Sequence, residues 1–313
     1  MAADCGRPEE ATVMADVTSQ AARPGFSRTC WRGIRIAHPS DWEPAYLSRL
    51  NEPMQCRFVD RRFERLQVTW QVLPREPDLP EMYRRLARHE GRKPSPALKG
   101  VPEWTGLVRH EGAGAVVHAG RFFRPGRWLV QVVMVWPEAR DRELERAVFE
   151  GISPQPAGQV RDWEALGLSA AVPADFDLTE AGSKVGKVAW DFKRPKRRWA
   201  GLSIERLAMP EAWLKGPLGE WLAGEIPPGF RPRRETPVDC GGQGGTEIYS
   251  RRASPVTFLL RTGMSRLDRA WLCRNEARVY RVAYWDRAAG QIDWPAGLEV
   301  HCCQGVRLGG RAR

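Results

Sequence analysis

Residues 31–43 read WRGIRIAHPSDWE, and residues 163–177 read WEALGLSAAVPADFD. Each stretch alternates apolar and polar residues as a half-buried strand does. A proline then ends the strand, and an acidic–aromatic–acidic turn follows it. Because the same pattern occurs in both halves of the chain, we predict that the protein contains two copies of one domain.

The elements that follow the two copies come in a similar order. In the first half, strand patterns flank a basic connection, and further strands lie between two helices that Asp78 and Asp141 cap. The predicted strands there are residues 55–59, 66–72, 115–122 and 128–136. In the second half, the corresponding strands are residues 186–190, 202–207, 256–260, 270–273 and 278–285, with a helix near residues 213–222. Pro217 should kink that helix, and residues 224–245 are dense in Pro, Arg and Gly and predict a loop.

Strands followed by a helix, then more strands and a final helix, predict an α+β fold. We expect two similar domains, each a curved antiparallel sheet with helices packed on it. The most apolar run, residues 128–136, should lie centrally in its sheet. The predicted boundaries are a disordered leader at 1–28, a first repeat at 29–153, a linker at 154–160, a second repeat at 161–304 and a basic tail at 305–313.

The apolar strand, the proline and the Asp-Trp-Glu turn also resemble the opening of Mog1/PsbP-like domains. The resemblance rests on Ile34, Ile36, Pro39 and Trp42, and the second copy has Phe176 where the tryptophan would stand. Domains of that family serve mainly as binding and assembly factors without chemistry of their own. The resemblance therefore implies a tandem duplication of a non-catalytic domain, and it carries over no site residues.

Composition indicates a folded, basic protein. Hydrophobic residues make up 42% of the chain, and 49 Lys and Arg stand against 38 Asp and Glu, for a net charge of +11. Such an excess favours an anionic partner. The seven cysteines show no disulfide framework, and no apolar run suits a signal peptide or a membrane span. We therefore expect a cytoplasmic protein with reduced thiols and no membrane partner.

A pair of basic connections is the most distinctive candidate binding site, because it occupies the same hairpin in both copies. Basic side chains with aromatic neighbours such as Phe63 suit contacts to phosphates and stacking on bases. The candidate polyanion-binding residues are Arg61, Arg62, Arg65, Lys193, Arg194, Lys196, Arg197, Arg198 and Trp199. The more ordinary interpretation is a solvated turn whose charges discourage pairing between sheet edges.

Other chemistry-bearing residues give weaker patterns. Cys240, Cys273, His301, Cys302 and Cys303 offer metal-ligating side chains, but only residues 301–303 are compact, and neighbours on a strand point to opposite faces. We therefore predict no metal site, and a redox role for Cys302 and Cys303 is left open. Residues 240–245 lack the Gly-Lys-Ser/Thr ending of a phosphate loop, and the scattered histidines have no nucleophile motif beside them. The sequence thus predicts neither catalytic residues nor a cofactor.

These observations predict a non-enzymatic macromolecule-binding protein. Binding would use the cleft between the copies or the basic hairpins. The first interpretation is a protein–protein adaptor or assembly factor with an unknown protein partner, which predicts an exposed apolar groove and binding that tolerates salt. The alternative is a nucleic-acid or polyanion binder that uses the paired basic hairpins. An enzyme with an unrecognised site between the domains is the third interpretation.

Overall fold

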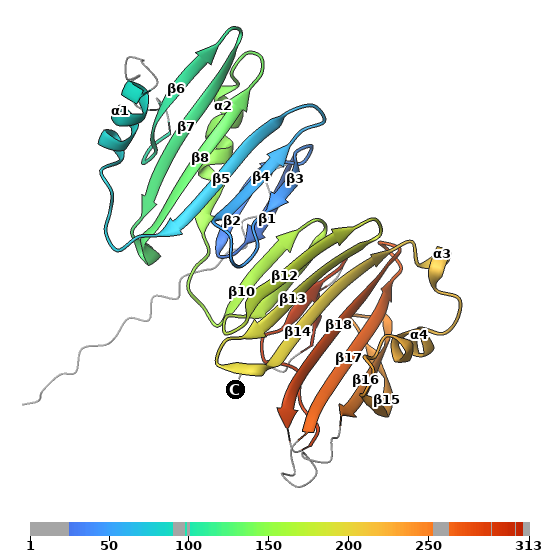
Figure 1. Cartoon of the computed structure of the whole chain (residues 1–313). Helices are drawn as coiled ribbons and strands as arrows, with labels where there is room; N and C mark the ends of the chain where they lie inside the picture. The colour runs from blue at the N-terminus through green and yellow to red at the C-terminus, as the bar shows by residue number, and fades with distance from the viewer. Residues whose placement is uncertain are drawn as a thin grey trace, which may run out of the picture.

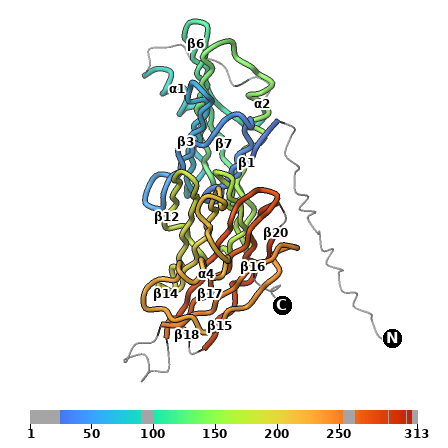
Figure 2. Tube along the Cα trace, turned by 90° about the vertical axis from the view of Figure 1, so that its right-hand side faces the viewer, coloured from blue at the N-terminus to red at the C-terminus, as the bar shows by residue number. Residues whose placement is uncertain are grey.

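The computed structural model describes residues 25–89, 98, 101–252, 263–288, 290–303 and 305–308. Over these residues the chain forms twenty β-strands, four short α-helices and one 3-10 turn. Figures 1 and 2 show an elongated molecule with the first half of the chain at one end and the second half at the other. The predicted α+β fold is therefore wrong, because the protein is mostly β.

Strands are spread along the whole described chain. Those of the first half are β1 (Phe26–Trp31), β2 (Ile34–Pro39), β3 (Glu43–Leu47), β4 (Met54–Val59), β5 (Glu64–Val72), β6 (Thr105–Glu111), β7 (Gly114–Phe123), β8 (Trp128–Trp136) and β9 (Ile152–Pro154). Those of the second half are β10 (Val160–Ala165), β11 (Leu168–Pro173), β12 (Asp177–Lys184), β13 (Lys187–Arg194), β14 (Arg197–Ala208), β15 (Arg231–Asp239), β16 (Gly244–Arg252), β17 (Gly263–Cys273), β18 (Arg278–Ala288), β19 (Glu299–His301) and β20 (Gly305–Arg307). The helices are α1 (Leu79–His89), α2 (Arg142–Glu150), α3 (Pro210–Trp213) and α4 (Leu218–Gly224), and the 3-10 turn is η1 (Pro125–Arg127).

The described strands form three antiparallel sheets. The shared sheet takes strands from both halves in the order β20-β19-β11-β10-β1-β2-β9. The first outer sheet has the order β3-β4-β5-β8-β7-β6, and the second outer sheet has the order β12-β13-β14-β18-β17-β16-β15. β8 lies inside its sheet, as its apolar run predicted.

Two tight hairpins in the shared sheet carry the repeated sequence pattern. The β1–β2 turn has positive φ at Arg32 (46°) and Gly33 (85°), and the β10–β11 turn has positive φ at Leu166 (55°) and Gly167 (72°). Two-residue turns of this kind match the twist of the strands they join. Aligning the two glycines makes Ala165 the counterpart of Trp31, so the sequence comparison that paired Trp31 with Trp163 was two residues out of register.

The two hairpins pair with each other, which explains why the predicted domain architecture fails. β1 lies antiparallel to β10, with Cys30 opposite Glu164. Each opening strand was expected to belong to its own domain and to be covered by helices. Instead, tryptophans of the shared sheet pack against β13 of the second outer sheet: the Trp31 ring centroid lies 5.9 Å from that of Trp190, and the Trp163 ring centroid lies 5.2 Å from that of Phe192. One continuous apolar core contains residues of both halves.

The two outer sheets have corresponding strand orders. β3 to β8 in the first half match β12, β13, β14, β16, β17 and β18 in the second, with β15 added at one edge. Apart from β15, the two outer sheets thus share one strand order. β15 lies within residues 224–245, where a loop was predicted, so that prediction is wrong. An edge strand tolerates Pro232 and Pro237, because one side of it needs no ladder hydrogen bonds.

The helices cover only parts of the outer sheets. α1 packs on the first outer sheet through Leu79 and Tyr83, and α4 packs on the second through Leu222. The resemblance to Mog1/PsbP-like domains is not supported, because the structure is mostly β-sheet. Asp141 caps α2 as predicted, accepting hydrogen bonds from the amides of residues 143 and 144. Pro217 interrupts the predicted helix, so that α3 and α4 form in place of one helix.

Several predicted segments meet the limits of the described residues. The predicted strand at residues 256–260 and residues 1–24 of the predicted leader lie outside them. β1 begins at Phe26, three residues before the predicted start of the first repeat, and β20 falls within the predicted basic tail. No helix of the described chain has the length and apolar character needed to cross a membrane.

Candidate functional site

A groove of about 990 Å³ lies between the two halves of the chain. Its walls come from β1 and β2 on one side and from the β10–β11 hairpin, the β12–β13 turn and the end of β14 on the other. Basic side chains outnumber acidic ones five to two in its lining. The charged lining residues are Arg28, Glu43, Glu164, Lys184, Lys187, Arg206 and Arg278.

Several of these cations are held by nearby oxygen atoms. Arg28 Nε lies 2.6 Å from a carboxylate oxygen of Glu164, an ion pair that joins β1 to β10. Arg206 donates a hydrogen bond of 2.9 Å to the carbonyl oxygen of Leu166, at the tip of the β10–β11 hairpin. The groove therefore presents a positive lining whose side chains are partly ordered before any ligand binds.

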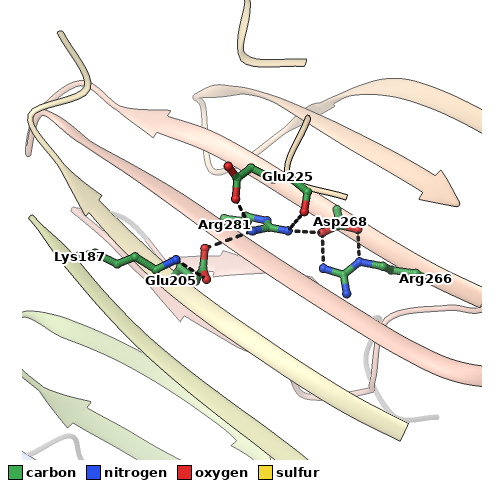
Figure 3. Close-up of polar contacts among 6 residues, drawn as sticks. All are labelled: Lys187, Glu205, Glu225, Arg266, Asp268 and Arg281. Atoms are coloured by element: carbon green, nitrogen blue, oxygen red, sulfur yellow. Dashed lines mark hydrogen bonds and ion pairs between the residues drawn. The ribbon is translucent and has the colours of Figure 1, made fainter. Parts of the chain in front are cut away.

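A chain of alternating charges positions Lys187 at the groove. The Lys187 ammonium lies 2.8 Å from Glu205 on β14, and Glu205 lies 3.3 Å from the guanidinium of Arg281 on β18. Figure 3 shows that Arg281 also contacts Glu225, just beyond α4, and Asp268 on β17. The alternating charges thus cross four neighbouring strands of the second outer sheet.

The inner end of this chain is buried. Asp268 has no exposed surface, and it accepts hydrogen bonds of 2.6 and 2.8 Å from Arg266 and one of 3.1 Å from Arg281. A carboxylate between two guanidinium groups satisfies the charges that burial would otherwise penalise. The network therefore connects Lys187 at the groove to buried charges on β17 and β18.

Two apolar side chains stand exposed at the rim. Val185 is 99% exposed at the tip of the two-residue turn between β12 and β13, beside the groove-lining Lys184 and Gly186. Met209 is 49% exposed, and a Cβ built on Gly186 would lie 3.9 Å from the Met209 methyl carbon. Neither residue was among those predicted from the sequence. The signal was an apolar residue inside Lys-Val-Gly-Lys, a turn sequence whose tip is ordinarily polar.

His38, one of the scattered histidines, lies at the groove. It is 3% exposed, its Nε2 is 3.0 Å from the Thr29 hydroxyl and its Nδ1 is 3.0 Å from the Pro39 carbonyl oxygen. Burial lowers the pKa of His38, since it disfavours the charged imidazolium. These contacts occupy both ring nitrogens and describe a structural side chain.

The predicted basic hairpins occupy corresponding turns, but on different sheets. The β4–β5 turn belongs to the first outer sheet and the β13–β14 turn to the second (Figure 1). Arg61, Arg62, Lys193, Lys196 and Arg198 are exposed. Trp199 is 47% exposed, and the Arg198 guanidinium lies over its ring at 4.7 Å from the centroid.

Three other members of the predicted set form ion pairs. Arg65 lies 3.4 Å from Asp60 and packs over the ring of Trp42, 5.5 Å from the centroid. Arg194 lies 2.9 Å from Asp175 and packs 4.5 Å from the ring centroid of Phe176, the counterpart of Trp42. Arg197 lies 3.6 Å from Asp286. Arg65 and Arg194 thus pack against aromatic rings at corresponding positions of the two halves.

The cysteines are placed differently from the expectation. Cys273, Cys302 and Cys303 converge, with their sulfur atoms all within 4.8 Å of one another. Cys302 and Cys303 do not, as was expected, point to opposite faces of a strand, because β19 ends at His301 and both cysteines lie in the turn before β20. Residues 240–243 form the turn before β16, so the glycine-rich stretch leads into a strand, whereas a phosphate loop leads into a helix.

Comparison with known proteins assigns no family. No protein-family model and no curated protein sequence matches the chain. Among solved structures, the apo immunity protein TplEi of the T6SS from Pseudomonas aeruginosa is 11% identical, with a TM-score of 0.32 over 87% of this chain and 90% of that one. A chain of the Tle4–Tli4 complex is 12% identical, with a TM-score of 0.33 over 87% of this chain and 88% of that one. Likenesses this low assign neither a fold nor a function.

Proposed function

We propose that the protein binds a partner protein with an acidic surface in the groove between its two halves. The observation that carries the proposal is the exposed apolar tip at Val185 next to a positive lining. A protein interface commonly combines apolar anchors with complementary charge. Burying a valine side chain completely contributes about 1.5–3 kcal/mol, so Val185 supplies an anchor that a purely ionic ligand would leave in water.

The positive charge of the groove lining favours a negatively charged partner. The five cations, the two lining carboxylates and Glu205, which pairs with Lys187, leave a formal excess of two positive charges at the groove. Such a surface attracts an acidic partner over a distance of about 8–10 Å at moderate salt and disfavours a basic one. The network from Lys187 to Asp268 keeps part of this lining in place, which lowers the entropy lost on binding.

The polyanion interpretation has less support. The two basic hairpins belong to different sheets, and three of their arginines are engaged in ion pairs with neighbouring carboxylates. The proposal includes no catalytic step.

Affinity capture from the native cell tests the proposal. The wild-type chain is compared with the groove variant Lys184→Glu/Arg278→Glu and with Val185→Asp. The hairpin variant Arg197→Glu/Arg198→Glu is the matched control, because it makes the same charge change away from the groove. We expect a protein that the wild type and the control retain and both groove variants lose. A partner that survives the groove variants, or a nucleic acid that only the hairpin variant loses, would overturn the proposal.

A further inference from the structure

The turn between β19 and β20 brings two cysteines to the end of β17. Cys273 Sγ lies 3.3 Å from Cys303 Sγ, and the three sulfurs of Cys273, Cys302 and Cys303 lie within 4.8 Å of one another. Cys273 is buried, Cys302 is half-buried and Cys303 is exposed. None of the three lines the groove. The cluster therefore has a closed side and an open side.

One amide group faces all three sulfurs. The side-chain nitrogen of Gln243 lies 3.5 Å from Cys273 Sγ, 3.9 Å from Cys302 Sγ and 3.3 Å from Cys303 Sγ. The side-chain amide of Asn275 approaches Cys303 Sγ at 3.2 Å. The positive ends of these amides thus point at the sulfur triangle, where a bound cation would also lie. Gln243 borders a hollow of about 520 Å³ with Asn275 and Arg274, so its side chain has space to move away.

Zinc binds cysteine in the thiolate form, so each of the three cysteines would lose its proton on binding.

We propose that Cys273, Cys302 and Cys303 bind one zinc ion. Tetrahedral zinc with sulfur ligands at about 2.3 Å places neighbouring sulfurs about 3.8 Å apart, so shifts of a few tenths of an ångström to an ångström would bring the cluster to that geometry. A disulfide would use two of the thiols and leave the third, whereas a metal ion uses all three. The fourth ligand is a water molecule on the open side, next to Cys303.

Zinc binding to the three thiols releases protons. Zn²⁺ and three thiols give one zinc tris-thiolate of net charge −1 and three protons, so affinity rises with pH. No electron is transferred. The ion would link β17 of the second outer sheet to the β19–β20 turn of the shared sheet, because the three ligands come from those two places. Zinc would therefore hold the β19–β20 hairpin against the second outer sheet.

Metal analysis of the reduced full-length chain tests the proposal. We expect one equivalent of zinc per chain after gel filtration, and a cobalt-substituted sample with a thiolate-to-cobalt charge-transfer band. Cys302→Ser and Cys303→Ser should each lose the zinc and the band, while Cys30→Ala, which removes a buried thiol outside the cluster, should keep both. Circular dichroism checks that every variant is folded.

Chelation gives a second readout. A zinc chelator should lower the melting temperature of the wild type and of Cys30→Ala but leave that of Cys303→Ser unchanged. Absence of zinc from the wild type, or zinc retained by both serine variants, would overturn the proposal. A disulfide among the three cysteines that leaves no zinc uptake after reduction would overturn it in favour of a redox pair.

Discussion

Removing the buried carboxylate of Asp268 should strongly destabilise the protein. In Asp268→Ala, Arg266 loses hydrogen bonds of 2.6 and 2.8 Å, and Arg281 loses one of 3.1 Å. Both arginine side chains are only 8% exposed, so water cannot replace the lost partner. Arg281 keeps Glu205 and Glu225, whereas Arg266 keeps mainly its position over Trp285, 5.3 Å from the ring centroid. The penalty should therefore fall mostly on Arg266.

Breaking a buried ion pair by removing one partner costs about 3–5 kcal/mol. With a urea m-value of about 3 kcal/mol/M, the midpoint of unfolding should fall by roughly 1–1.7 M. Urea unfolding followed by tryptophan fluorescence measures this shift. The matched control is Asp175→Ala, which breaks an ion pair whose carboxylate is 61% exposed and should change stability by less than about 1 kcal/mol. If the two variants have the same midpoint, the assignment of Asp268 as the centre of a buried network is wrong.

Two further changes test the fold. Burial raises the pKa of Asp191 in the folded protein above its ordinary value of 3.8. The protonated carboxyl therefore stabilises the fold below pH 3.8, and this stabilisation is lost as pH rises through the pKa of the folded state. Asp191→Asn should therefore raise the melting temperature at pH 7, with a gain that shrinks towards pH 4, and an equal gain at both pH values would contradict this. Gly167→Ala should lower stability by about 1–2 kcal/mol, because φ is +72° and the new Cβ would meet the Arg206 guanidinium. Gly182→Ala, which has open space, is its control in thermal unfolding.

Local features of the fold could be predicted from the sequence. Pro39 and Pro173 mark the ends of β2 and β11, and the alternation before each proline identifies the strand. Asp141 sits where a cap was expected, and the apolar run of β8 lies inside its sheet. These features depend on a few neighbouring residues, so period and turn chemistry are sufficient to find them.

Features that depend on distant residues could not be predicted. The pairing of Cys30 with Glu164 joins hairpins from different halves, and no local pattern signals it. Because β15 contains two prolines, its sequence predicted a loop, although an edge strand accepts proline. The groove and the cysteine cluster likewise arise from segments far apart in the chain.

The binding constant of the captured partner tests the central claim most directly. Isothermal titration of the purified partner should compare the wild type, the groove variant Lys184→Glu/Arg278→Glu and the hairpin variant Arg197→Glu/Arg198→Glu. Loss of about 1.4 kcal/mol or more would raise the Kd of the groove variant about tenfold or more, while the hairpin variant should match the wild type. Equal affinity of the groove variant and the wild type would contradict binding in the groove.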